Sequence, residues 1–420
     1  MRRFLAWLTG KRESQTQHSP TAGKAESPAE NHTRFAVDLY LRLKDYVGHY
    51  DNVVCSPFAV SLALASLHTG ARGRTAAEIE KVLHPVAAAD RWQSELTAVR
   101  NRLLAGAGTN AFVLSLANGL WTPAEFPLLK EFREAVAQFY GAEPQQTDFS
   151  QEDSTRNAIN QWAKGATRHM FDAVVARSEL TPDARLLSIS ALCFNGLWAH
   201  PFGIQQTIEE PFWVNPHTKI LASMMWQRGP FAYGQFPFHF ADRIQVIELP
   251  YAGGELSMVF LLPEGIEGVI ELEHTMGRQT GKLPGWLGEL RPRKVDVTVP
   301  KFAFGSRFNL EDSLGELGLS TACSQDDAEF TGMRPARDVF LSHVFHQALV
   351  AIDEYGPDGD AAAGGPAKAA GGREKDPGPV PMFRADHPFL FLVRERISGQ
   401  FLLIGRVMNP PVAPKFTPVL

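Results

Sequence analysis

Apolar side chains follow two different spacings along the chain. In the first part they recur with helical spacing, as Phe35, Leu39 and Leu43 do, which predicts a helix with one buried face. In the later part they alternate or run on without interruption. The stretch 186–198 is apolar almost throughout and predicts a strand buried on both faces, and 295–304 alternates. Helices followed by strands favour a single α+β domain with antiparallel or mixed sheets.

Short motifs mark where several of these elements begin or turn. Ser56 followed by Pro57 predicts a helix start, because serine caps a helix and proline fits its first position. Thr75, with Glu78 three residues later, predicts a capping box that opens another helix. The pair Gly253-Gly254 between two apolar runs predicts a β-hairpin.

The charge balance limits the kinds of partner. The 420 residues carry a net charge of −5, so no basic excess is available to bind nucleic acid. No apolar run is long enough to span a membrane. We therefore expect that neither nucleic acid nor a membrane is a partner. We also expect the protein to be a monomer. The three cysteines, Cys55, Cys193 and Cys323, are odd in number and widely spaced, which argues against a disulfide framework.

The N-terminal residues differ from the rest of the chain. Arg2 and Arg3 precede a short apolar run, which falls below the roughly 7–15 apolar residues of a secretory signal. The residues that follow, up to Glu30, are polar and rich in Ser, Thr, Pro and Gln. We expect 1–30 to be a disordered lead-in to one domain over 31–420. The lack of a clear signal peptide favours a cytoplasmic location.

The sequence offers no recognisable catalytic centre. It contains no Gly-x-Ser-x-Gly elbow, no phosphate-binding glycine loop between a strand and a helix, and no His-Glu-x-x-His motif. His343 and His346 lie three apart in a strand-like run, so they face opposite sides and cannot chelate one metal together. We expect no enzyme activity, no metal and no cofactor.

A long segment of small residues stands out near the C-terminal end. Between two strand-like runs, 352–389 contains a stretch dominated by Gly, Ala and Pro. Loops longer than about 12–15 residues without structure of their own are functional or disordered. Composition alone leaves both interpretations open.

Several motifs in a fixed order resemble one protein family. They are NVVCSP at 52–57, GARGRT at 70–75, FNGLW at 194–198, ELPY at 248–251, VPKF at 299–302, DHPF at 386–389 and Gly405-Arg406. From about residue 32 to 410 the chain resembles the serpins. The resemblance implies a fold of three β-sheets with eight or nine helices, and an exposed reactive-centre loop at about 355–382. It also implies a metastable suicide substrate whose loop is cleaved by a target protease and then inserts into the central sheet. Family members are often extracellular, which leaves the location open.

The resemblance also assigns residues to the region where the central sheet must open. These are Ser56, Pro57, Ser190, His346 and Trp198. Ser190 stands where the family has Asn and Ala59 where it has Ser. We therefore expect fewer polar contacts around His346 than is usual.

The first part of the loop has the alternation that insertion requires. Residues assigned to the hinge by the resemblance are Glu354, Gly356, Pro357, Gly359, Ala361, Ala362 and Ala363. Counted from Glu354, one face holds only small or uncharged residues, while Asp358 and Asp360 fall on the opposite face. Pro357 is the exception, because it removes one ladder hydrogen bond. The alternatives are an inhibitor of serine, or else cysteine, proteases and a non-inhibitory serpin-fold binding or substrate-like protein.

The bond offered to a protease is less well defined. By the family's usual spacing, counting forward from Glu354 reaches Ala370, and counting back from Pro388 reaches Pro377. Arg373 and Lys375 lie between these two positions, and either would fit the acidic pocket of a trypsin-like protease. Asp376 and Pro377 after Lys375 disfavour cleavage there. We predict Arg373-Glu374 as the bait bond, with Lys375-Asp376 second, and a trypsin-like serine protease as partner.

Overall fold

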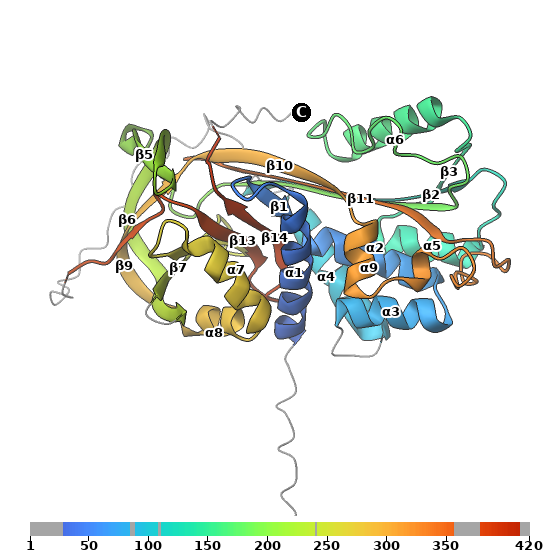
Figure 1. The fold of residues 1–420 in the computed structure, drawn as a ribbon, viewed down its shortest axis with the longest axis horizontal. Coiled ribbons are helices and arrows are strands. Elements are labelled where there is room, and N and C mark those ends of the chain that lie inside the picture. Colours follow the sequence, from blue (N-terminus) through green and yellow to red (C-terminus); the bar gives the residue numbers. More distant parts are fainter. Residues whose placement is uncertain (1–27, 85–88, 108–110, 240–241, 357–378, 412–420) are drawn as a thin grey trace, which may run out of the picture.

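The computed structural model describes residues 28–84, 89–107, 111–239, 242–356 and 379–411 (Figure 1). These residues contain nine α-helices: α1 (Pro28–Leu43), α2 (Pro57–Gly70), α3 (Gly73–Leu83), α4 (Ala89–Gly106), α5 (Lys130–Tyr140), α6 (Glu152–Ala166), α7 (Gly268–Arg278), α8 (Lys282–Glu289) and α9 (Glu311–Leu317). Short 3₁₀ turns lie at Lys44–Tyr46 (η1), Ile204–Gln206 (η2) and Thr321–Cys323 (η3).

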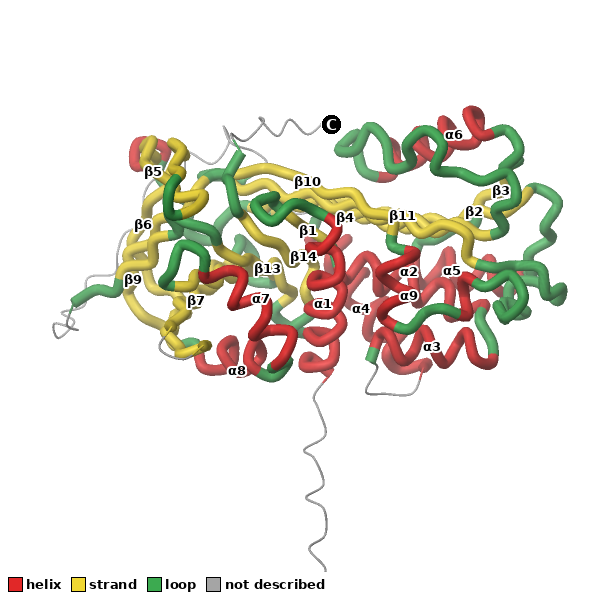
Figure 2. The backbone as a smooth tube through the Cα atoms, in the orientation of Figure 1, coloured by secondary structure: helices red, strands yellow, loops and turns green. Residues whose placement is uncertain are grey.

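The strands form two hydrogen-bonded networks. They are β1 (Val53–Cys55), β2 (Phe112–Pro123), β3 (Gln145–Thr147), β4 (Leu186–Gly196), β5 (Thr207–Asn215), β6 (Thr218–His239), β7 (Asp242–Pro250), β8 (Leu256–Pro263), β9 (Arg291–Pro300), β10 (Phe302–Asn309), β11 (Leu341–Ile352), β12 (Met382–Arg384), β13 (Phe389–Glu395) and β14 (Phe401–Val407). Figure 2 shows β5, β6, β7 and β9 at the left with α7 and α8 beneath them, α2, α3, α5 and α9 at the right, and β10, β11 and β2 running across between the two sides.

The first network is a five-stranded sheet with the order β10-β11-β4-β2-β3. Its centre is the pair β4 and β11, which run parallel, whereas β11 pairs antiparallel with β10 and β4 pairs antiparallel with β2. Every residue of β4 is buried, which confirms the strand predicted from its continuous apolar run. The helix α6 covers one face of this sheet, and α2 and α5 lie on the other (Figure 1).

The second network has nine strands in two parts that share β6. One end of β6 pairs with β5 and the middle with β9, which also holds β12. The other end pairs with β7, from which β8, β13, β14 and β1 continue. Together with the five-stranded sheet, these two parts give the three sheets that the sequence predicted.

The lead-in predicted over 1–30 stays a prediction, because residues 1–27 lie outside the described part; the last three residues of that range belong to α1 as described. One prediction about the start of a helix needs correction. The helix α3 begins at Gly73 without a side-chain cap, so Thr75 and Glu78 form no capping box. Thr75 Oγ1 instead accepts from the backbone N–H of Glu329, and Glu78 accepts two hydrogen bonds from Thr321.

Candidate functional site

A buried histidine connects β11 and β4 to the start of α2. The backbone N–H of Ser56 donates to His346 Nε2 at 2.9 Å. Because Nε2 accepts, Nδ1 carries the proton and lies 2.9 Å from Ser190 Oγ and 3.2 Å from the Ser190 carbonyl oxygen. Burial lowers the pKa of His346 to about 4, so the ring is neutral near pH 7. His346 and Ser190 are register partners, and the ring thus joins the two parallel strands.

The predicted helix start at Ser56 is confirmed. Ser56 Oγ accepts from the backbone N–H of Ala59 at 3.0 Å, and Pro57 occupies the first turn. The same residue therefore caps α2 with its side chain and binds His346 with its backbone. Both ring nitrogens of His346 have partners, and Ser190 supplies a hydroxyl group. That these contacts are fewer than is usual in the family stays a prediction.

At the far end of β11 the chain turns sharply around Asp353. Asp353 Oδ1 accepts from the backbone N–H groups of Tyr355 at 3.0 Å and Gly356. Its carbonyl oxygen accepts from Trp198 Nε1 at 2.8 Å, and the Trp198 ring stacks on Tyr251 with ring centroids 4.5 Å apart. The structure therefore places Trp198 at this turn and not with Ser56, Ser190 and His346.

Glu354 is held by residues from two other elements. Its carboxylate lies 2.7 Å from Lys301 Nζ, which follows β9, and accepts from Thr207 Oγ1 at 2.7 Å. The Glu354 carbonyl oxygen accepts from the backbone N–H of Phe202 at 3.3 Å. Burial would raise the pKa of Glu354, but the hydrogen bonds from Lys301 and Thr207 and the Lys301 charge outweigh burial and lower it. The side chain is ionised and fixes the point where the loop begins.

Gly356 meets the end of β4. Its φ of +81° favours glycine, and a Cβ atom added there would lie 2.6 Å from backbone atoms of Gly196 and Leu197. Of the predicted hinge positions, Gly356 thus packs against the end of β4, and Glu354 is held by Lys301 and Thr207. The other predicted hinge and bait-bond residues lie outside the described part: Pro357, Gly359, Ala361, Ala362, Ala363, Arg373, Glu374, Lys375 and Asp376.

Sequence reasoning missed three residues that hold the hinge, namely Lys301, Thr207 and Asp353. Lys301 lies within the VPKF motif, which carried the family resemblance but indicated no partner. Thr207 lies in an ordinary polar stretch. Only the fold brings both to Glu354.

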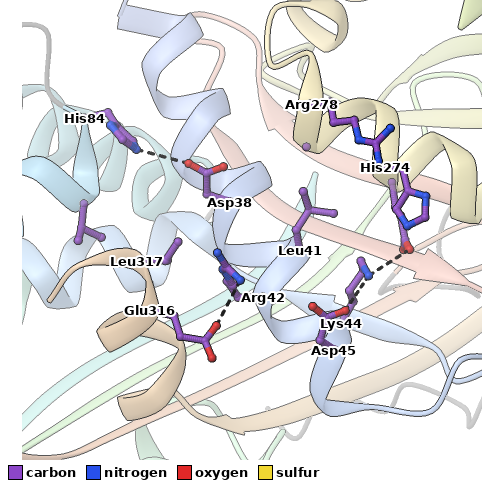
Figure 3. Close-up of a pocket in the computed structure, with 13 residues that line it drawn as sticks. Asp38, Leu41, Arg42, Lys44, Asp45, His84, His274, Arg278, Glu316 and Leu317 are labelled. Carbon is purple, nitrogen blue, oxygen red and sulfur yellow. Dashed lines mark hydrogen bonds and ion pairs between the residues drawn. The ribbon is translucent and has the colours of Figure 1, made fainter. Parts of the chain in front are cut away.

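A separate groove lies between α1, α7 and α9, and most of its charges are paired (Figure 3). His84 lies 3.4 Å from Asp38, and Arg42 lies 3.3 Å from Glu316. Lys44 lies 2.7 Å from Asp45 and also approaches the buried Glu273 at 3.8 Å. These pairs join α1 to its neighbours, away from the hinge.

His343 and His346 have separate partners, and the described residues hold no cluster of metal ligands. Among them, no cluster of three or more His, Cys, Asp or Glu side chains is arranged to hold a metal ion. His343 contacts Glu311 and Thr181 while His346 contacts Ser56 and Ser190, so the two histidines diverge as predicted. None of the described helices is both long and apolar enough to cross a membrane.

Known proteins resemble this chain over most of its length. The family model described as serpin (serine protease inhibitor) matches residues 30–410. Human leukocyte elastase inhibitor is 33% identical over 399 residues, which is 92% of this chain and 100% of that protein. A serpin-like protein of Thermococcus kodakarensis is also 33% identical, over 90% of this chain and 84% of its own length.

Solved structures agree with this result. Uncleaved ovalbumin matches with a TM-score of 0.80 at 26% identity, covering 92% of this chain and 100% of ovalbumin. Maspin matches with a TM-score of 0.80 at 27% identity, covering 91% of this chain and 98% of maspin. The family is one of protease inhibitors and not of enzymes, in agreement with the sequence prediction. The chain belongs to the serpin family.

Proposed function

We propose that this chain inhibits a serine protease by inserting its cleaved loop between β4 and β11. The observation that carries the proposal is the parallel pairing of these strands beside the fixed hinge. A segment that follows β11 and turns back at Gly356 runs antiparallel to β11 and, between the two, antiparallel to β4 as well. Antiparallel ladders are slightly more stable per residue than parallel ones, so the exchange is favourable.

The contacts of the hinge residues also support insertion of the loop between β4 and β11. Asp353 and Glu354 fix the chain directly after β11, and Gly356 packs against the end of β4. A loop that starts at this point lies beside the end of the β4–β11 pair, where the two strands would first part to admit it. The alternation from Pro357 to Ala363 then places small side chains on one face of the inserted strand.

Two variants of neighbouring residues test the insertion. Ala361→Arg puts a charge on the face that insertion buries, whereas Asp360→Arg alters the opposite face. We expect Ala361→Arg to lower the yield of a covalent protease complex at least about tenfold, which corresponds to roughly 1.4 kcal/mol, and Asp360→Arg to leave it nearly unchanged. A denaturing gel measures the complex at the summed mass. Equal yields for both variants would contradict insertion.

A non-inhibitory serpin is the second candidate, and Pro357 favours it. Proline removes a ladder hydrogen bond and leaves a buried partner unpaired, at a cost of roughly 1–3 kcal/mol. Differential scanning calorimetry of the intact and clipped wild-type chain distinguishes the candidates. Insertion raises the midpoint temperature of unfolding sharply after clipping. A non-inhibitory chain keeps its midpoint temperature, and on a denaturing gel it gives only a clipped band and no protease complex.

The target is proposed from the loop sequence and from relatives. Arg373-Glu374 remains our proposed bait bond, with Lys375-Asp376 second, for a trypsin-like protease. The relatives named leukocyte elastase inhibitors point instead to an elastase, whose small specificity pocket would take Ala370. Mass spectrometry after brief exposure to trypsin or elastase identifies the bond. Cleavage outside 368–377 would remove both assignments.

A further inference from the structure

Asn195 is a buried polar residue that the hinge contacts leave unused. It lies near the end of β4 and is fully buried, and neither its Oδ1 nor its Nδ2 has a hydrogen-bond partner within the part of the chain that the structure describes. Buried side-chain amides nearly always have partners, so this one requires an explanation. Its register partners are Val113 on β2 and Ala351 on β11, neither of which has a polar side chain to offer.

Asn195 lies close to the turn that follows β11. Side chains two apart on a strand share a face, so Asn195 lies on the same face as Ala191 and Cys193, which pack with Phe171 beside α6. Its partner Ala351 is followed by Ile352 and then by Asp353 of the hinge turn. Asn195 is therefore at the end of the β4–β11 pair from which an inserting strand enters.

We propose that Asn195 is a positioning residue that favours the parting of β4 from β11. In the closed sheet its amide has lost water and gained no hydrogen bond. When the two strands separate, the amide reaches water or the polar backbone of an entering strand. The parted state is thereby stabilised relative to the closed one, at the point where parting begins. This inference rests on the proposed function, because it assigns a residue to that movement.

Hydrogen exchange of the intact, uncleaved chain tests the inference. Asn195→Leu replaces the amide by an apolar side chain of similar size. We expect amides of β4 and β11 to exchange roughly five- to tenfold more slowly in this variant. The matched control is Ser115→Ala, because Ser115 Oγ is also buried and has no partner among the described residues, but lies on β2, which stays paired with β4. The control should leave β11 exchange unchanged.

Each outcome decides the question. Unchanged exchange of β4 and β11 in Asn195→Leu, or equal slowing in Ser115→Ala, would overturn the assignment. If Asn195→Leu does not fold, the smaller Asn195→Val serves with the same expected result. Calorimetry of the clipped wild-type chain is read separately: an unchanged midpoint contradicts the proposed inhibitor function, while exchange in the intact chain still decides the role of Asn195.

Discussion

His346 shows how one residue serves two roles through its two ring nitrogens. Nε2 accepts from the backbone of Ser56 and Nδ1 donates toward Ser190, so a single neutral ring ties α2, β11 and β4 together. A doubly protonated ring loses the first contact, because Nε2 would become a donor facing the N–H of Ser56, whereas Nδ1 would still donate toward Ser190. The pH dependence of stability follows from this arrangement.

We predict that the chain loses stability as the pH falls from about 6.5 toward about 4. Burial lowers the pKa of His346 to about 4 from an ordinary value of 6.5, so the unfolded chain binds a proton before the folded one does. Between pH 7 and pH 5 this difference in proton binding lowers the free energy of unfolding by about 2 kcal/mol. Urea unfolding at both pH values measures it. In His346→Gln the loss should shrink by that amount, and an unchanged loss would assign it to other groups.

At the scale of elements, the turn after β11 is fixed by its fit against β4. Asp353 gathers the backbone N–H groups of the turn, and Gly356 brings the chain against the backbone at Gly196. Two separate demands therefore meet at Gly356: a positive φ, and space too small for a side chain. A comparison with another glycine distinguishes them.

We predict that Gly356→Ala destabilises the intact chain more than Gly318→Ala does. Both residues have positive φ, at +81° and +112°, so both variants carry backbone strain of roughly 1–3 kcal/mol. Only at Gly356 would the new Cβ collide with backbone, since Gly318 has no atom within 4 Å of that position. Thermal unfolding measures the difference. Equal losses would mean that the hinge moves away from β4 at little cost.

At the scale of the whole molecule, a buried charge network ties the first helix to the last strand. Glu273 on α7 accepts from Tyr40 on α1 at 2.6 Å and lies 3.2 Å from Arg406 on β14. Glu273 and Arg406 are both almost fully buried. Burial, and then the Glu273 charge, raise the pKa of Tyr40 well above its usual value, so the phenol stays neutral and donates. Segments from both ends of the domain thus depend on one carboxylate.

We predict that Glu273→Gln destabilises the chain by about 3–5 kcal/mol, because it leaves the buried Arg406 without its counter-charge. Glu316 lines the same groove and pairs with Arg42 at the surface, so Glu316→Gln should change stability by less than about 1 kcal/mol (Figure 3). Chemical unfolding of both variants tests the contrast. Similar small losses in both variants would contradict the need for the Glu273 charge beside the buried Arg406.

Local patterns predicted the elements, and missed contacts between distant residues. The continuous apolar run of β4, the Ser56 cap and the Gly253-Gly254 turn were each correct, because burial period and turn conformation depend on neighbours in sequence. The capping box failed because Thr75 and Glu78 found partners at Glu329 and Thr321. A side chain binds whichever donor the fold leaves unsatisfied, and the sequence does not identify that donor.

The sequence by itself determined the order of helices and strands and the family, since each depends on local spacing or ordered motifs. Only the tertiary structure decided that Lys301 and Thr207 hold Glu354, that Trp198 lies at the turn after β11, and that Asn195 has no hydrogen-bond partner among the described residues. The physical reason is that hydrogen bonds and ion pairs are satisfied in space. The strands that bring these groups together lie far apart along the chain.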